Sequence, residues 1–324
     1  MRLIRIAPLI VFAAMSLPAA ADWHAREAAI MGTRIAVELW HEDPAAAEQA
    51  IDAVLAEMRR VDALMSHYKP ESQLSQINAR GATETVHVDR ELSMLIARAL
   101  GFSETTGGAF DITYASVGYL YDFRAHLRPS DAQIAAGLGA VDWHHVVVDR
   151  ENSTVRYTSP GVRIDLGGIA KGYAVDRAIT LFEARGIRHA SVTAGGDSRI
   201  LGDRFGRPWM VGIRHPDDEQ RIIARIPLED AAISTSGDYE RYFDEGGQRY
   251  HHIINPRTGK SAGEVRSVTI IGAEATLTDA LSTSVFVLGP ERGMALVERL
   301  GTVDAVIVRP DGKVLYSSGL VAPE

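Results

Sequence analysis

The stretch 162–182 reads VRIDLGGIAKGYAVDRAITLF, and its hydrophobic period changes at a pair of glycines. The apolar residues of 162–166 fit a short strand, whereas those after Gly168 recur at the three- and four-residue spacing of a helix. Two adjacent glycines let the backbone turn sharply between the two elements. The stretch therefore predicts a strand, a tight turn and a helix that ends near Gly186, since glycine is typical just beyond a helix.

Strands and helices are mixed on both sides of this stretch. A helix is expected from Pro44, which Asp43 can cap, and others around Leu95, from about Thr278 and from Pro290. Strands are expected at 35–39, 146–148, 155–157, 190–192, 210–213, 222–226, 250–254, 268–271, 306–308 and 314–316. Because the elements do not alternate as regular βαβ units, the sequence predicts an α+β fold with mixed or antiparallel sheets.

Composition excludes several classes of protein. The chain has 324 residues, with 34 Lys and Arg against 42 Asp and Glu, so its net charge is −8. This acidic balance argues against general nucleic-acid binding, which needs a surplus of basic residues to neutralise phosphates. The absence of cysteine excludes disulfides, thiolate catalysis and zinc–cysteine sites. Any metal site in this chain must therefore use oxygen or imidazole ligands.

The first 21 residues have the pattern of a signal peptide. Arg2 and Arg5 precede a short apolar run, and Ala19-Ala20-Ala21 offers small residues before the expected cleavage point. The apolar run is too short to span a bilayer as a helix. We therefore expect export to the periplasm, cleavage, and a soluble mature protein without a membrane anchor. No internal repeat or linker divides 22–324, which is expected to form one large domain.

The common short catalytic motifs are absent from the chain. It contains no G-x-S-x-G, G-x-G-x-x-G, G-x-x-x-x-G-K-[ST] or H-E-x-x-H pattern. It has two adjacent histidine pairs, His144-His145 and His251-His252. Neighbouring residues on a strand point to opposite faces, so neither pair is a ready-made metal clamp. These absences weaken the case for serine hydrolases, nicotinamide dehydrogenases, P-loop kinases and zinc proteases.

The glycine turn is the first of three candidate sites. Asp165 precedes Gly167-Gly168, and Lys171 lies at the start of the following helix. Free N–H groups at a helix start, together with a cation, suit a phosphate or diphosphate. The alternative is a purely structural turn between a strand and a helix.

The second candidate lies in the segment Thr278–Thr283. Asp279 and Thr283 are four residues apart, so both side chains emerge on one face of the expected helix. Carboxylate and hydroxyl oxygens are ligands for hard cations such as magnesium or calcium. The alternative is an acid favoured by the helix dipole and a threonine bonded back to its own backbone.

The third candidate is the segment Tyr250–Gly259, in which a strand delivers His252 to a turn rich in proline and glycine. A histidine with a pKa near neutrality could accept a proton from a hydroxyl nucleophile. A structural histidine packed at a strand end is the alternative.

Taken together, seven segments of the chain resemble the ApbE family of FAD:protein FMN transferases. They occur in one order between Met31 and about Gly289: 31–33, 65–68 with Ser72 and Asn78, 108–113, 164–173 with Asp176, 194–197, 251–259 and 279–283. The resemblance implies helices and sheets around a central FAD-binding cleft. It also implies transfer of the FMN half of FAD to a Thr or Ser hydroxyl of a target protein, dependent on Mg²⁺ or another hard divalent cation, with release of AMP.

The resemblance also assigns roles to individual residues. It implies that Asp279, Thr283 and a backbone carbonyl near Gly168 hold the metal, with Ser282 as a further contact. It implies that His252 is the catalytic base, with Asp111 and Asp165 as second choices. The FAD-contacting residues that it implies are Met31, Tyr68, Ala109, Phe110, Asp111, Asp165, Lys171 and Ile254.

The acceptor is expected to be another protein. The chain has no clear D-x-x-[ST]-G-A-[ST] segment of the kind the family modifies, and typical acceptors are flavin-bearing subunits of exported or membrane redox complexes. Two alternatives remain open. One is an FAD pyrophosphatase that gives FMN and AMP, and the other is a periplasmic FAD-binding protein without catalysis.

Overall fold

The computed structural model describes residues 22–320, so the expected signal peptide at 1–21 lies outside the described residues. The largest element is an eight-stranded sheet in the order β1-β2-β6-β7-β10-β15-β16-β17. Its strands are β1 (Asp22–Ile30), β2 (Thr33–His41), β6 (Ala190–Ala194), β7 (Asp197–Leu201), β10 (Ala232–Gly237), β15 (Ser267–Gly272), β16 (Asp304–Val308) and β17 (Val314–Tyr316). Every neighbouring pair in this sheet is antiparallel.

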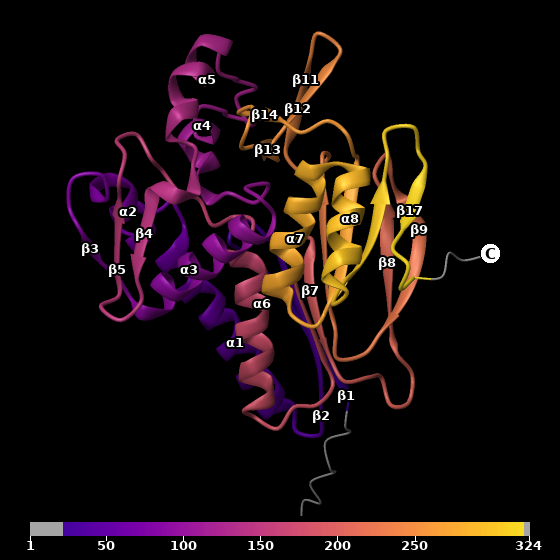
Figure 1. Cartoon of the computed structure of the whole chain (residues 1–324). Coiled ribbons are helices and arrows are strands. Elements are labelled where there is room, and N and C mark those ends of the chain that lie inside the picture. Colours follow the sequence, from indigo (N-terminus) through magenta and orange to yellow (C-terminus); the bar gives the residue numbers. More distant parts are fainter. Residues whose placement is uncertain (1–21, 321–324) are drawn as a thin grey trace, which may run out of the picture.

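One face of the large sheet is covered by helices, with α6 lying between α1 and α7 (Figure 1). The long helices are α1 (Pro44–Met65), α3 (Arg90–Thr105), α6 (Ala170–Glu183), α7 (Ala275–Leu288) and α8 (Pro290–Leu300). Helix α1 begins as expected, with Pro44 in its first turn and the Asp43 side chain accepting from Ala45 N. Its buried residues, including Ile51, Val54 and Met58, recur at helical spacing and join the main core.

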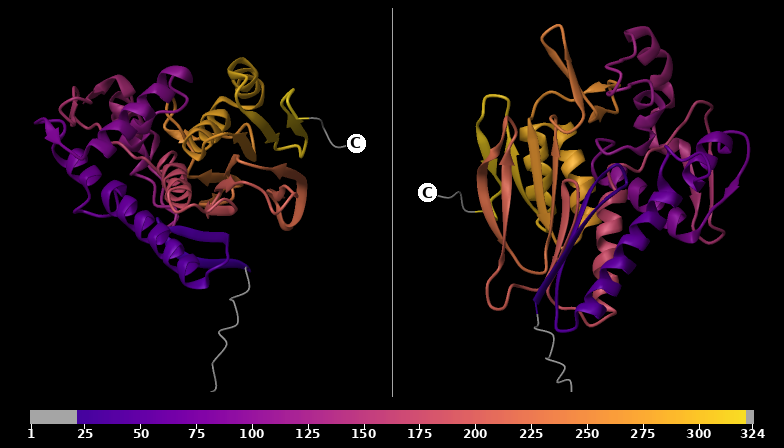
Figure 2. Two further views of the ribbon diagram at one scale, coloured as in Figure 1. Left: turned by 90° about the horizontal axis from the view of Figure 1, so that it is seen from below. Right: turned by 180° about the vertical axis from the view of Figure 1, so that it is seen from behind.

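The opposite face of the sheet is covered by a long hairpin of β8 (Trp209–His215) and β9 (Asp218–Leu228), seen beside the sheet in Figure 2. The alternation of β16 explains this arrangement. Ala305 and Ile307 pack in the cluster of α7 and α8, whereas Val306 packs with Ile213 and Ala224 of the hairpin. The sheet is therefore buried on both faces at this point.

The remaining elements lie at one end of the molecule and beside α3 (Figure 1). They are α2 (Gln73–Arg80), β3 (Val86–His87), η1 (Ile112–Tyr114), α4 (Ala115–Gly118), α5 (Asp131–Gly137), η2 (Leu138–Ala140), η3 (Trp143–His145), β4 (Val146–Asp149), β5 (Thr154–Tyr157), β11 (Tyr242–Glu245), β12 (Gln248–His251), β13 (Ile254–Asn255) and β14 (Lys260–Ser261). The β11–β12 hairpin projects from this end of the molecule and leads directly into His252.

The expected α+β class is confirmed, but the strand expected at 162–166 is wrong and the one expected at 250–254 is interrupted between β12 and β13. Residues 162–166 are extended but pair with no strand. Side chains bond several of their backbone groups instead: Asn78 bonds both the N–H and the carbonyl of Ile164, and Ser116 accepts from the N–H of Arg163, while the N–H of Asp165 donates to the carbonyl of Ile112. Side-chain hydrogen bonds thus take the place of bonds to a neighbouring strand, and a hydrophobic pattern alone does not reveal such partners. Among the described residues no helix is long and apolar enough to cross a membrane.

Candidate active site

The glycine turn and the start of α7 lie against each other. The N–H of Gly172 donates to Asp279 Oδ2 at 3.0 Å, and Lys171 Nζ lies 3.4 Å from Asp279 Oδ1. A Cβ at Gly172 would overlap the carbonyl of Ala275 and lie 2.8 Å from Asp279 Cβ. Gly172 therefore permits the close approach of α6 and α7 that brings the second half of the glycine segment to the predicted metal ligand.

Asp176 sets the position of α7. Its carboxylate accepts from the N–H groups of Ala275 and Thr276, at 2.9 and 2.8 Å, and from the Thr276 hydroxyl. The same carboxylate binds Arg199 of β7 at 2.7 Å. The residue before α7, Glu274, makes no capping hydrogen bond of its own. A carboxylate from α6 therefore caps α7 and links both helices to the sheet.

Thr283 lies next to the first half of the glycine segment. A Cβ at Gly168 would lie 3.4 Å from Thr283 Oγ1 and 3.2 Å from the Phe110 ring. The predicted metal residues Asp279, Thr283 and Gly168 thus lie around one location. Ser282 instead donates to the carbonyl of Asp279 and bonds Ser236 of β10 at 2.8 Å.

A further buried carboxylate, which the sequence analysis did not single out, lies beside Lys171. Asp197, at the start of β7, is 2% exposed and lies 2.5 Å from Lys171 Nζ. Burial and the charge of Asp197 both raise the pKa of Asp279. Burial disfavours the charged form of Lys171, but the two carboxylates outweigh it and raise the pKa of the ammonium. Two acids and one base therefore share a largely buried site.

The donor set fits a hard divalent cation. Asp279 is 2% exposed, so an unpaired charge there would be costly, and Lys171 alone leaves the two carboxylates incompletely neutralised. Carboxylate, hydroxyl and carbonyl oxygens are the ligands that Mg²⁺ takes. Within residues 22–320 no three His, Asp or Glu side chains are grouped as metal ligands. Asp279, Thr283 and one backbone carbonyl are fewer ligands than the six that Mg²⁺ takes, so a cation held by them would keep positions open for a substrate.

The segment around Tyr68 forms the other side of the site. His67 Nδ1 contacts Asp165 at 2.7 Å, and the rings of His67 and Tyr68 lie 3.8 Å apart. Burial disfavours both charges, yet the ion pair raises the pKa of His67 and lowers that of Asp165. Asp165 is therefore ion-paired with His67, and its lowered pKa makes it a poor general base. Tyr68 itself is 76% exposed, which leaves a ring face open to a planar ligand.

Met31 lies in the tight turn between β1 and β2, where Met31 and Gly32 both have positive φ, at 56° and 68°. Arg241, another residue that the sequence analysis did not single out, reaches this turn: a Cβ at Gly32 would lie 3.7 Å from Arg241 Nη2. Arg249, on the following hairpin, contacts Asp238 and Asp244, whereas Arg241 makes no ion pair with any described residue. Arg241 therefore brings a positive charge to this side of the site, close enough to Asp165 to help lower the pKa of that carboxyl.

The segment 109–111 lies beneath the site. Ala109 and Phe110 are buried, and Phe110 packs edge-on against Phe102. Both carboxylate oxygens of Asp111 are used within the protein, one by the N–H and hydroxyl of Thr113 and the other by the N–H of Trp143. Asp111 is thus a capping residue, which removes it as a second choice for the base.

His252 follows β12, and its N–H donates to the carbonyl of Arg241 at 3.1 Å. Its ring Nδ1 is buried without a hydrogen-bond partner. Burial and the nearby Arg241 charge lower the pKa of His252 to about 3, so the ring is neutral at pH 7 and has a lone pair available. Anionic charge brought into the site would raise this pKa towards the range of an efficient base.

The preceding residue, His251, is structural. Its Nε2 donates to the carbonyl of Ala262, and its Nδ1 accepts from the N–H of Ile253. His251 ends β12 and His252 lies just beyond it, and the two rings differ in that His251 has partners for both nitrogens whereas Nδ1 of His252 has none.

Ile254 does not fit the expectation that it lines the cleft. Its side chain is 5% exposed and packs with Val117, Tyr121 and Ile134 in a separate cluster under α4 and α5. An apolar residue two positions after His252 could line the cleft or pack in the core. The burial of Ile254 shows that it packs in the core.

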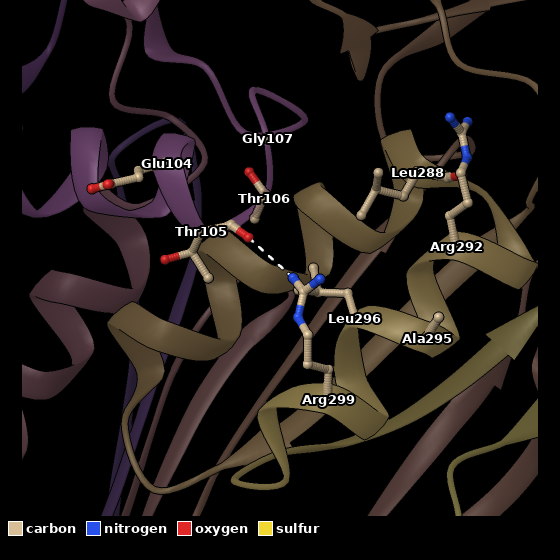
Figure 3. Close-up of a pocket in the computed structure, with 9 residues that line it drawn as sticks. All are labelled: Glu104, Thr105, Thr106, Gly107, Leu288, Arg292, Ala295, Leu296 and Arg299. Carbon is tan, nitrogen blue, oxygen red and sulfur yellow. Dashed lines mark hydrogen bonds between the residues drawn. The ribbon is translucent and has the colours of Figure 1, made fainter.

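A cavity of about 490 Å³ lies elsewhere, between the end of α3 and the helices α7 and α8 (Figure 3). Arg292 and Arg299 line it, and Arg299 donates to the carbonyl of Thr105. None of the predicted site residues lines this cavity. The candidate active site is therefore defined by its convergent polar groups and not by this hollow.

Comparison with known proteins agrees with this arrangement. A model of the ApbE family matches residues 31–307. The FAD:protein FMN transferase of Treponema pallidum (strain Nichols) is 34% identical over 318 residues, which cover 92% of this chain and 88% of that protein. The enzyme of the same name from Vibrio cholerae (O395) is 34% identical, with 84% and 83% covered.

Solved structures give the same result. The ApbE protein of Thermotoga maritima superposes with a TM-score of 0.85 at 36% identity, covering 92% of this chain and 98% of that one. The apo form of Pseudomonas stutzeri flavinyl transferase ApbE gives a TM-score of 0.81 at 29% identity, with 92% and 95% covered. With a family model over most of its length and relatives above 30% identity, this chain belongs to the ApbE family.

Proposed function

We propose that this protein transfers the FMN moiety of FAD to a Thr or Ser hydroxyl of an acceptor protein and releases AMP, in a reaction that depends on Mg²⁺. The observation that carries the proposal is the convergence of Asp279 and Thr283 with the Gly168–Gly172 turn in one largely buried site. The names of the curated relatives, FAD:protein FMN transferases, support the same reaction.

Asp279, Thr283 and the Gly168 carbonyl are the residues that would hold Mg²⁺. When bound, the ion would supply positive charge that withdraws electron density from the diphosphate and stabilises the departing phosphate. Ser282 supports this arrangement by bonding the carbonyl of Asp279 and Ser236. Its hydroxyl would thus orient the helix turn that carries Asp279.

His252 would take the proton of the acceptor hydroxyl. In the transfer, the acceptor oxygen forms a bond to the FMN phosphorus, the bond between that phosphorus and the bridging oxygen breaks, and AMP leaves with the bridging oxygen. The proton released from the hydroxyl moves to the His252 ring, which is neutral in the free protein. The diphosphate charge would offset Arg241 and make the ring more basic in the complex.

The exposed side of the site would hold the planar part of FAD. The Tyr68 ring is exposed and could stack on a planar group. The turn that carries Met31 lies next to Arg241, which belongs to the same side of the site. Arg241 would bring positive charge that suits a diphosphate, whereas the charge of Lys171 is paired with Asp197 and Asp279. Phe110, packed beneath Gly168, would fix the floor of the site.

We also propose that the reaction takes place in the periplasm. The basic and apolar pattern of residues 1–21, followed by small residues, supports export. The acceptor would then be an exported protein or an exported domain of a membrane redox complex. Blocking cleavage by an Ala21→Pro substitution and following the size and location of the product would test this part of the proposal.

A direct test is to incubate the protein with FAD, MgCl₂ and an acceptor carrying the segment D-x-x-T-G-A-T. Transfer predicts a mass gain of one FMN moiety on the acceptor and one AMP released for each, both abolished by chelator. The same acceptor with Thr replaced by Val in the modified position is the control. AMP release without a mass gain would instead indicate an FAD pyrophosphatase, and FAD binding without AMP would indicate a binding protein.

A further inference from the structure

Asp197 occupies a fixed position at the start of β7. It follows Gly195, which has a φ of 62°, and Gly196, whose carbonyl accepts from the N–H of Thr235 at 3.0 Å. A Cβ at Gly196 would lie 2.5 Å from the Thr235 carbonyl oxygen, so the turn is packed tightly against β10. Asp197 also pairs with Ser234 in the sheet register. The carboxylate is therefore held by backbone that cannot easily move.

Lys171 has two acidic neighbours but is bound unequally to them. Its Nζ lies 2.5 Å from Asp197 Oδ2, and 3.4 and 3.5 Å from the two oxygens of Asp279. The first distance is that of a strong charge-assisted hydrogen bond, and the other two are at the limit of one. The ammonium is thus drawn towards β7 and away from α7.

A cation at this site would need lone pairs of the Asp279 carboxylate. Within residues 22–320, the Asp279 carboxylate accepts one other hydrogen bond, from the N–H of Gly172. Were the lysine to move onto Asp279, it would compete with a metal ion for the same lone pairs. The long side chain of lysine, with its freely rotating bonds, makes such a move possible unless a stronger partner holds it.

We propose that Asp197 is a positioning residue that holds the Lys171 ammonium off Asp279 and so keeps Asp279 available to a divalent cation. The inference rests on the proposed function, because it takes Asp279 as a metal ligand. It assigns a role to a carboxylate that would itself touch neither the metal nor the transferred group.

The test is a double-mutant cycle on metal binding. Mn²⁺ is added to FAD-free wild type, Asp197→Asn, Lys171→Met and the double variant, and free Mn²⁺ is measured by electron paramagnetic resonance. In the wild type, Lys171→Met is expected to change Mn²⁺ affinity by less than about threefold, because the lysine is already held aside. In the Asp197→Asn background the same substitution is expected to raise affinity about tenfold or more.

The cycle separates positioning from simple charge effects. If Asp197 acts only through its negative charge, Lys171→Met changes Mn²⁺ affinity by the same factor in both backgrounds, and that result would overturn the inference. Wild-type protein that binds no Mn²⁺ would overturn the metal site of the proposed function, and this inference with it. A wild type that binds Mn²⁺ but transfers no FMN would contradict the proposed function alone.

Asp238→Asn is the matched control. Asp238 is also buried, at 6% exposure, but its ion-pair partners are Arg249 and Arg266 and not Lys171. Its substitution should leave Mn²⁺ affinity unchanged. If Asp197→Asn fails to fold, as judged by its melting curve, the Lys171→Met variant alone decides: a rise in Mn²⁺ affinity of more than tenfold would show that the lysine already occupies Asp279 and would refute the inference.

Discussion

The two sides of the candidate site are built differently. The metal side, made of the start of α6, the start of α7 and the start of β7, consists of buried groups fixed by hydrogen bonds, and Asp279 is 2% exposed. The flavin side, made of the Met31 turn, His67–Tyr68, Arg241 and His252, is open, and Tyr68 is 76% exposed. The difference indicates that the proposed metal side is preorganised, whereas the proposed flavin side would be completed by its ligand.

The largest effect should come from the metal side. Asp279→Ala removes the only carboxylate from the predicted ligand set, so Mg²⁺-dependent transfer should fall about 10³-fold or more, the equivalent of several kcal/mol of charge stabilisation. The measurement is AMP release against Mg²⁺ concentration, with Asp238→Asn as the control. Full Mg²⁺-dependent activity in Asp279→Ala would remove this residue from the ligand set.

His252→Ala tests the catalytic part of the flavin side. Turnover should fall roughly 10²–10⁴-fold, the usual cost of losing a general base, while FAD affinity stays within a few-fold of the wild type. FAD binding is followed by flavin fluorescence and turnover by AMP release. An equal loss of both would make His252 a binding residue.

The pH dependence of the wild-type enzyme tests the lowered pKa of His252. Because burial and Arg241 lower the pKa of His252 to about 3, the ring of the free protein stays unprotonated as the pH falls from 8 to 5. At saturating Mg²⁺, His252 should therefore cause no decline in kcat/KM over that range, since this parameter reports the free enzyme. A decline centred near pH 6.5 that disappears in His252→Ala would contradict the lowered pKa.

Gly172→Ala should test how tightly the metal side is packed. The added methyl group would overlap the Ala275 carbonyl, so α6 and α7 would have to separate. We expect a loss of about 1–3 kcal/mol in the free energy of unfolding, as for other overpacked sites, together with weaker metal binding. Gly101→Ala in α3 is the matched control, because nothing lies within 4 Å of its Cβ position and the change should be neutral or slightly stabilising. Equal melting temperatures for the two variants would show that the helices are not closely packed.

The smallest effect is expected at Tyr68. Replacing it by Ala should weaken FAD binding by about 0.5–1.5 kcal/mol, which is the contribution of one aromatic stack, and leave stability unchanged because the ring is exposed. Tyr119→Ala is a suitable control, since Tyr119 is also exposed but lies against Arg163. A Tyr68→Ala variant with a lowered melting temperature and unchanged FAD affinity would place the ring in the fold and not in the flavin side.

The sequence was informative wherever a local pattern determines structure. The Asp43–Pro44 start of α1 and the shared face of Asp279 and Thr283 follow from helix geometry alone. The strand expected at 162–166 is wrong because its hydrogen bonds go to side chains such as Asn78 and to Ile112, and not to a neighbouring strand. Such long-range partners leave no periodic signal.

The same reason explains what was missed in the site. Asp197 contacts Lys171, and Arg241 lies near Gly32, and in both cases the two residues are far apart in the sequence. Their spacing matches no helix or strand period that would have predicted the contact. Asp197 did lie in one of the seven recognised segments, next to two glycines, and that was the one available signal. Ile254 shows the converse: its proximity to His252 in the chain suggested a shared surface, and its burial in another cluster excluded it.

The carboxylate of Asp176 joins three elements at a single point. It bonds two N–H groups of α7 and Arg199 of β7, while itself belonging to α6. Lys171, Asp279 and Asp197 each belong to one of these three elements. The amide protons of Ala275 and Thr276 should therefore exchange slowly with solvent as a pair, and their exchange rates would report the integrity of the whole charged cluster in a protein that carries neither nucleotide nor ion.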